Sequence, residues 1–171
     1  MTPHGGAPTD AELVAAAVRL GGSLRAAGWL MATAESCTGG MVGHIITQVP
    51  GSSDHYVGGI VSYSDAVKTQ LLGVDAQILE RLGAVSPEVA DAMATGALER
   101  FSQAELAVSV TGIAGPDGGT DDKPVGLVYV AAARRGRAAR VVRRVWPHDR
   151  DGNKRASTLL ALELAFDSAA E

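Results

Sequence analysis

Two side chains with nucleophilic atoms, Ser36 and Cys37, stand next to each other in a polar segment between two apolar ones. The apolar run 29–32 precedes them and the segment 41–46 has helical spacing, so they lie where a strand turns into a helix. The first N–H groups of a helix are unpaired and carry the positive end of its dipole, which suits an anion or a developing oxyanion. The position therefore favours acyl transfer through a covalent intermediate. The alternative is that Ser36 or Thr38 only caps the helix.

Cys37 is a second possible nucleophile at this turn. A thiol at a helix N-terminus has a lowered pKa and can attack without a strong base. The commoner state of a single cysteine is buried and unreactive. Both nucleophiles therefore stay open at this stage, and only the serine requires a partner base.

A base for Ser36 must be lysine or tyrosine, because no histidine lies near a glycine-rich turn. Lys68 lies near the start of a helix expected at about 65–72, where the dipole lowers the pKa of an ammonium group. That pKa must fall from ~10.4 to near neutrality, a change of about 4 kcal/mol that also requires burial or a nearby cation. Asp65 acts in the opposite direction. The commoner arrangement is a solvated lysine whose stem covers apolar neighbours.

Tyr63 closes a strand expected at 57–63. Its hydroxyl could pass a proton between Ser36 and Lys68, or it could hydrogen-bond to a substrate. More often a tyrosine in this position belongs to the core and keeps its hydroxyl at the rim. Two glycines in the same strand, Gly58 and Gly59, weaken it or let another group approach its backbone.

The loop 111–119 is a second unusual stretch, with glycines at 112, 115, 118 and 119. It leads into another strand rather than a helix, so it is neither a P-loop nor a dinucleotide-binding fingerprint. Glycines permit positive φ and close backbone approach, so we expect this loop to line a site. The alternative is a plain connection between strands.

Basic residues gather where the last predicted helix begins: Arg150, Lys154 and Arg155. A helix N-terminus and positive side chains would together suit a phosphate group. A solvated basic face is the alternative. A separate group of six arginines between 134 and 144 flanks a predicted hairpin turn at Gly136, and we interpret it as a solvated turn.

The elements that must position these residues follow from hydrophobic periodicity and from cap and turn residues. Helices are expected at 10–27, 38–48, 65–72, 75–82, 87–102 and 149–168, and strands at 29–34, 57–63, 106–110, 125–133 and 138–146. Helix-connected strands imply parallel pairs, and the hairpin implies one reversed strand. The predicted fold is a three-layer α/β/α sandwich around a mixed five-stranded sheet with one antiparallel strand.

Length and composition limit the remaining classes of protein. The 171 residues, 46% hydrophobic and 20% charged, suit one compact domain at 10–168 after a disordered tail at 1–9. A net charge of −4 argues against a nucleic-acid partner, and no apolar run approaches the length of a membrane span. The N-terminus lacks the features of a signal peptide, so we expect a cytoplasmic protein. One cysteine and four scattered histidines predict neither a disulfide nor a metal site.

Four motifs, in the same order, resemble the CinA C-terminal domain family of nicotinamide-nucleotide amidohydrolases. They are the segments 33–40, 61–64 together with Lys68, 83–86, and 109–119 together with 123–126. The resemblance extends over about residues 10–168 and agrees with the α/β/α fold. It implies hydrolysis of the carboxamide of nicotinamide mononucleotide to nicotinate mononucleotide and ammonia, in pyridine nucleotide salvage and without a cofactor.

The resemblance also implies roles for individual residues. Ser36 corresponds to the family's nucleophile, and Lys68 and Tyr63 correspond to the residues that assist it. Substrate-binding residues are expected at the two glycine-rich segments and at the last helix, namely Cys37, Thr38, Gly39, Gly40, Thr111, Gly112, Gly115, Arg150 and Arg155. Gly152 and Asn153 are poor helix formers, which places the phosphate contacts near them in question.

Family members commonly form homo-oligomers, and a homo-oligomer is expected here too. Many carry an N-terminal domain associated with nucleotide pyrophosphatase activity, for which this chain has no room, so we expect that activity to be absent. Two other functions compete with the amidohydrolase. One is a non-catalytic domain that binds a nucleotide or a partner linked to competence or DNA damage, and the other is an amidase for a different small amide.

Overall fold

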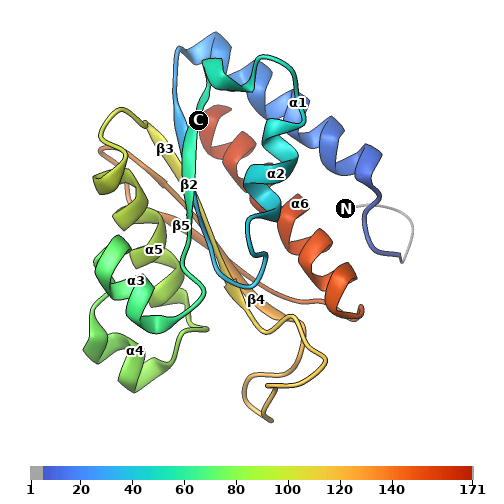
Figure 1. Ribbon diagram of the computed structural model, residues 1–171, viewed down its shortest axis with the longest axis vertical. Coiled ribbons are helices and arrows are strands. Elements are labelled where there is room, and N and C mark those ends of the chain that lie inside the picture. Colours follow the sequence, from blue (N-terminus) through green and yellow to red (C-terminus); the bar gives the residue numbers. More distant parts are fainter. Residues whose placement is uncertain (1–5, 171) are drawn as a thin grey trace.

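The computed structural model describes residues 6–170, which form three layers with the sheet in the middle (Figure 1). The helices are α1 (Asp10–Ala27), α2 (Met41–Thr47), α3 (Asp65–Leu72), α4 (Ala76–Leu82), α5 (Pro87–Arg100) and α6 (Arg150–Ala170), with a short 3₁₀ helix η1 (Ser52–Asp54). The strands are β1 (Met31–Glu35), β2 (Tyr56–Val61), β3 (Leu106–Gly112), β4 (Leu127–Arg134) and β5 (Arg140–Val145). The predicted order of helices and strands is confirmed.

The sheet has the strand order β2-β1-β3-β4-β5. Strand β1 is parallel to both β2 and β3, whereas β4 is antiparallel to β3 and to β5. One strand is therefore reversed, which confirms the predicted mixed sheet. The cause is local: helices connect the parallel strands, whereas a tight turn at Gly136, with φ +74°, joins β4 to β5.

Two hydrophobic cores cover the two faces of the sheet. Helices α1, α2 and α6 lie on one face, and α3, α4 and α5 lie on the other (Figure 1). Strand β1 is buried on both faces, so Met31 belongs to the first core while Ala32 and Ala34 belong to the second. Because side chains alternate along a strand, Glu35 falls on the same face as Met31, toward α2.

The element boundaries differ from the predicted ones where long-range pairing decides them. Strand β3 continues to Gly112 because Thr111 and Gly112 pair with β4. Strand β2 ends at Val61, so Tyr63 lies beyond the strand rather than closing it. The residues from Val61 to the start of α3 form the connection that enters the candidate site.

The segment before α1 is partly built into the fold. Thr9 caps α1, in a reciprocal arrangement with Glu12. Pro8 is buried. Residues 8 and 9 therefore belong to the folded part instead of the predicted tail, while residues 1–5 lie outside the described part of the chain. In the described part, no helix combines the length and the apolar character that crossing a membrane requires.

Candidate active site

A pocket of about 260 Å³ opens beyond the carboxyl ends of the parallel strands β1 and β3. This is where α/β sheets usually bind ligands. Its lining comes from the β1–α2 turn, the β2–α3 connection with α3, the α4–α5 turn, the end of β3 with the loop after it, and the start of α6. The lining residues are Ser36, Cys37, Tyr63, Lys68, Ala84, Val85, Thr111, Gly112, Ile113, Ala114, Gly115, Asp117, Gly118 and Arg150.

Ser36 stands directly after β1 and is 8% exposed. Its N–H donates to the carbonyl of Val110 on β3, at 2.9 Å, so the backbone at this point is fixed to the sheet. No side chain of residues 6–170 hydrogen-bonds to Ser36 Oγ. The hydroxyl therefore faces the pocket with its hydrogen-bonding capacity free for a substrate or a base.

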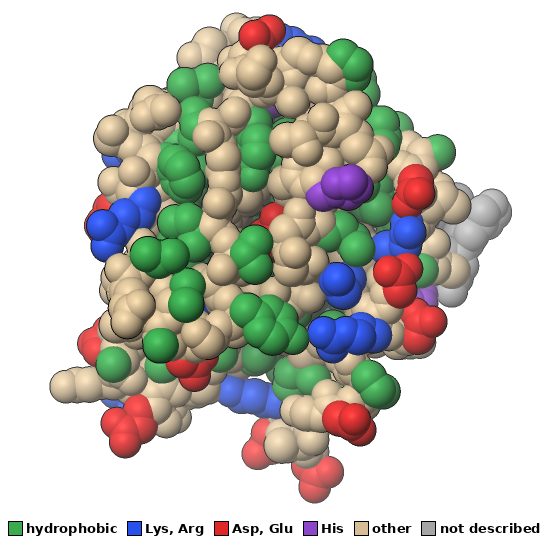
Figure 2. Space-filling view, in the orientation of Figure 1, with side chains coloured by type: hydrophobic (Ala, Val, Ile, Leu, Met, Phe, Trp, Pro, Cys, Tyr) green, Lys and Arg blue, Asp and Glu red, His purple; other side chains and the backbone are tan. Residues whose placement is uncertain are grey.

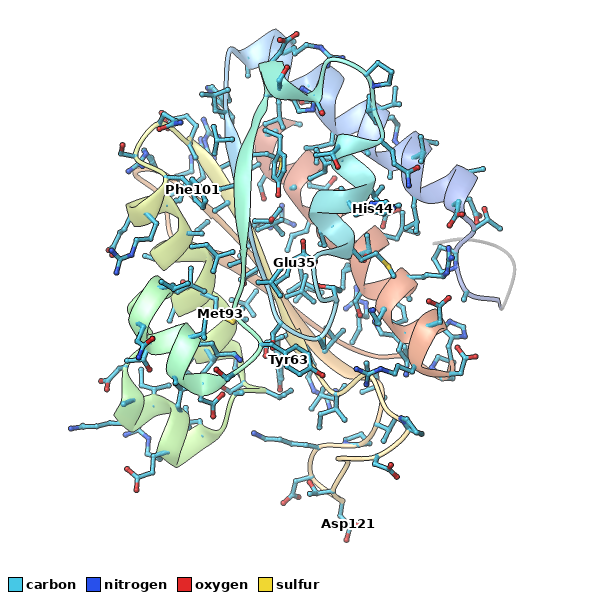
Figure 3. All side chains as sticks on the ribbon, viewed as in Figure 1. Glu35, His44, Tyr63, Met93, Phe101 and Asp121 are labelled. Atoms are coloured by element: carbon cyan, nitrogen blue, oxygen red, sulfur yellow. The ribbon has the colours of Figure 1, made fainter. Side chains whose placement is uncertain are left out.

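Glu35 caps α2 from the strand before it. Its carboxylate is 2% exposed and accepts three backbone N–H groups, from Gly40 and Val42 at 3.0 Å and from Gly43 at 2.9 Å. Figure 3 shows Glu35 between the sheet and α2. The sequence-based alternative that Ser36 or Thr38 caps this helix is therefore wrong, because the acceptor is the carboxylate that precedes both.

The glycines of this turn have a conformational role. Gly39 and Gly40 have φ of +65° and +97°, a region that side chains with a Cβ rarely occupy. Neither they nor Thr38 line the pocket. The N–H of Gly40 is already used by Glu35. Gly39 and Gly40 therefore shape the turn that carries Ser36, rather than contact a ligand with their own atoms.

Cys37 lines the pocket but is an unreactive thiol. Burial is the main cause that raises its pKa to about 12, and the nearby Glu35 adds to the effect. A thiol with that pKa is protonated at neutral pH, and the thiolate is the nucleophilic form. The lowered pKa expected of a thiol at a helix N-terminus is wrong here, because burial outweighs the dipole.

Lys68 is one of the largest fully buried side chains, with 1% exposure. Its Nζ donates to the carbonyls of Ser62, at 2.9 Å, and of Tyr63, at 3.4 Å, and lies 3.6 Å from Asp65 Oδ1. Burial lowers its pKa, whereas the carboxylate of Asp65 opposes that shift. The sequence-based alternative of a solvated lysine is wrong, since α3 packs so that Lys68 faces the molecule's interior.

Tyr63 and Arg150 meet at the mouth of the pocket. Arg150 donates from Nη2 to the Tyr63 hydroxyl, at 3.3 Å, and from Nη1 to the carbonyl of Gly115, at 2.6 Å. Tyr63 is 63% exposed, so it is not a core tyrosine. In the space-filling view, hydrophobic side chains cover the region of β2 and α3, and basic side chains lie beside them near the start of α6 (Figure 2).

The glycine-rich loop after β3 lines the pocket, as predicted, and is tied to the opposite wall. Lys123 donates from Nζ to the carbonyl of Leu82 at the end of α4. Thr111 donates to the carbonyl of Ala84, at 2.8 Å. These two contacts join the loop to the α4–α5 turn on the other side of the pocket.

Arg155 lies outside the pocket. It pairs with Asp10 and Asp151, both at the surface, and contacts no residue of the pocket. Of the basic residues at the start of α6, only Arg150 reaches the lining. Asn153, which the sequence analysis regarded as a poor helix former, is 2% exposed and donates to the carbonyl of Ala114, at 2.9 Å. This hydrogen bond therefore connects α6 to the glycine-rich loop after β3.

Sequence reasoning missed several residues of the site. Glu35 was passed over although it precedes the nucleophile, and a carboxylate just before a helix start was the available signal. Asp117 lies in the loop that was predicted to line a site, and Ala84 and Val85 lie in the motif 83–86, but none of the three was assigned a role. Only the tertiary fold brings the motif 83–86 to the pocket.

Comparisons with known proteins decide the family. The family model described as the CinA C-terminal domain matches residues 14–168. The chain belongs to this family. A CinA-like protein from Mycolicibacterium vanbaalenii is 51% identical over 138 residues, which cover 81% of this chain and 32% of the relative. A putative competence-damage inducible protein from Symbiobacterium thermophilum is 48% identical over 164 residues, covering 91% of this chain and 38% of the relative.

Solved structures agree with the CinA fold. The competence/damage inducible protein CihA from Agrobacterium tumefaciens has a TM-score of 0.90 at 38% identity, covering 96% of this chain and 98% of that one. A CinA superfamily protein from Klebsiella pneumoniae has a TM-score of 0.87 at 31% identity, covering 92% and 98%. The chain spans about a third of the length of the curated relatives that it matches.

Proposed function

We propose that this CinA-family domain hydrolyses the carboxamide of nicotinamide mononucleotide, giving nicotinate mononucleotide and ammonia. The observation that carries the proposal is the meeting of Ser36, a buried Lys68 with a lowered pKa, and Arg150 around one pocket. These residues supply a nucleophile, a base and a phosphate ligand. The family resemblance supplies the substrate.

The surroundings of Lys68 suit a neutral amine that acts as a base. Two backbone carbonyls accept from Nζ and hold it in place, while burial lowers its pKa and so favours the neutral form. A neutral amine has one lone pair, which can take up a proton. In the proposed reaction, Ser36 Oγ attacks the amide carbon while Lys68 takes the serine proton, directly or through the Tyr63 hydroxyl. The tetrahedral intermediate collapses, and ammonia leaves with a proton returned by Lys68.

Water then completes the reaction. It attacks the acyl ester of Ser36 and loses a proton to Lys68, and nicotinate mononucleotide is released as Lys68 returns that proton to Ser36 Oγ. Arg150 suits the 5′-phosphate, because a guanidinium can donate two hydrogen bonds to one phosphate. It is already held at the pocket by Gly115.

To test the proposal, chelator-treated protein is incubated with nicotinamide mononucleotide and the released ammonia is measured. The variants Ser36→Ala, Lys68→Met and Cys37→Ala are measured in the same way. Release is expected from the wild type and Cys37→Ala, and should fall by at least about 10³-fold in the other two. No release by the folded wild type would reject the deamidase. Turnover of simple amides in its place would identify another amidase, and binding without turnover of any amide would identify a binding domain.

A further inference from the structure

The turn between β1 and α2 uses most of its own N–H groups. Glu35 accepts those of Gly40, Val42 and Gly43. Two other residues of the turn, Gly39 and Met41, donate to backbone carbonyls. Every buried backbone N–H needs a partner, so the groups that remain unpaired identify where a ligand can bind.

Two N–H groups remain. Neither the N–H of Cys37 nor that of Thr38 donates to another residue within residues 6–170, and both directly follow Ser36. Cys37 lines the same pocket as Ser36. A backbone N–H beside a serine nucleophile, at a residue that lines the pocket, is the kind of donor that stabilises the oxyanion of acyl transfer. Of the two residues only Cys37 meets that condition, because Thr38 does not line the pocket. The N-terminus of α2, by contrast, is already neutralised by a buried carboxylate.

We propose that Glu35 is a positioning residue for the reaction. By taking up the N–H groups that open α2, it holds the turn in the shape that leaves the N–H of Cys37, the residue next to Ser36 that also lines the pocket, free to donate to the oxyanion. Glu35 itself touches no reacting atom, since its carboxylate faces α2 and does not line the pocket. The inference rests on the proposed role of Ser36 as nucleophile.

Glu35→Gln tests this with almost no change in shape. A carboxylate offers two acceptor oxygens, whereas an amide offers one oxygen and an NH₂ group that would face a backbone N–H. At least one N–H of α2 then loses its partner and the turn shifts. With nicotinamide mononucleotide, kcat should fall by roughly 10²-fold while KM stays within about threefold. Thr47→Val is the matched control, because it removes hydrogen bonds from the same helix at its far end.

The control should lower the melting temperature while leaving kcat within about twofold of the wild type. A Glu35→Gln variant with wild-type kcat, or with a raised KM alone, would overturn the proposal. If that variant does not fold, Glu35→Asp is used: it keeps the charge but is one methylene shorter, so it cannot reach all three N–H groups, and its kcat should fall as well. Wild-type kcat in Glu35→Asp would overturn the proposal equally.

A second readout separates this inference from the choice of substrate. An alkyl fluorophosphonate modifies an activated serine: the Ser36 Oγ–P bond forms, fluoride leaves, and the serine proton passes to the base. The rate of labelling at Ser36, followed by mass spectrometry, should fall in Glu35→Gln in parallel with kcat. If the wild type releases no ammonia but is labelled, the deamidase fails and the labelling rates still decide the role of Glu35. Equal rates in both proteins, or no labelling of the wild type, would overturn it.

Discussion

Lys68 has three oxygen atoms around its amine, two from the backbone and one from Asp65. The carbonyls orient the amine without adding a full charge, so burial can lower its pKa while Asp65 limits the shift. A base must be neutral to accept a proton, so kcat/KM should rise with pH through the pKa of Lys68. The acidic limb of the pH profile therefore reports on this residue.

Asp65→Asn should move that acidic limb to lower pH. Removing the carboxylate removes a charge that raises the pKa of Lys68, so the amine loses its proton more readily. Asp65 is 58% exposed and its charge is screened, so the shift should be less than about one pH unit. The measurement is kcat/KM against pH, with Asp75→Asn, at the cap of α4, as the control. A limb that moved to higher pH would contradict this account.

Arg150 and Arg155 form a matched pair of arginines at the start of one helix. Arg150→Met should raise KM for nicotinamide mononucleotide by roughly 10-fold or more, since a charge-assisted contact to phosphate contributes about 1.5–3 kcal/mol. Arg155→Met should leave KM unchanged, because Arg155 pairs with Asp10 and Asp151 away from the pocket. Steady-state kinetics with the mononucleotide and the riboside would distinguish them. Equal effects of the two variants would place the phosphate elsewhere.

At the scale of the elements, α3 depends on close contact with α5. A Cβ on Gly96 of α5 would stand 1.9 Å from the carbonyl oxygen of Leu72, at the end of α3. Glycine is therefore required here by packing, in a helix that would otherwise favour alanine. Since α3 carries Lys68, this contact also sets the depth at which the base is buried.

Gly96→Ala should destabilise the fold by about 3 kcal/mol or more, because the two helices must separate to admit the methyl group. Gly22→Ala in α1 is the control: a Cβ there meets nothing within 4 Å, so it should stabilise the fold by about 0.5–1 kcal/mol. Urea unfolding of the two variants gives both values. Gly96→Ala with wild-type stability would show that α3 and α5 can separate without loss.

At the scale of the whole molecule, hydrogen bonds at the pocket connect several segments that are far apart in the sequence. Arg150 joins the start of α6 to the β2–α3 connection and to the glycine-rich loop. Lys123 joins that loop to the end of α4. The loop therefore bridges parts of the chain that belong to opposite faces of the sheet.

Lys123→Met should loosen the loop and raise KM by roughly 3- to 10-fold, with a smaller effect on kcat, since the ordering of the loop would then oppose binding. Lys123→Arg keeps a donor for the carbonyl of Leu82 and should retain most of the wild-type KM. Kinetics with nicotinamide mononucleotide compare the two. If Lys123→Met keeps the wild-type KM, the hydrogen bond from Lys123 to the carbonyl of Leu82 plays no part in substrate binding.

Local sequence patterns predicted much of the fold. The hydrophobic periodicity and the cap residues of the segments 10–27 and 87–102 predicted α1 and α5, because helix propensity and capping act within one or two turns. The order of strands and helices then restricted the sheet to few topologies, and the hairpin at Gly136 predicted the reversed strand. The position of Ser36 at a strand-to-helix turn was equally readable.

Tertiary structure decided the electrostatic environment of the site. Burial of Lys68 and Cys37 depends on how α3 and α2 pack, and the sign of each pKa shift follows from that burial. Separation of Arg150 from Arg155, five residues apart on one helix, depends on which face of α6 meets the pocket. The sequence by itself determined the elements and the family motifs, because these depend on neighbouring residues. Only the tertiary structure decided which charges are buried and which meet, because desolvation and pairing depend on residues distant in the chain.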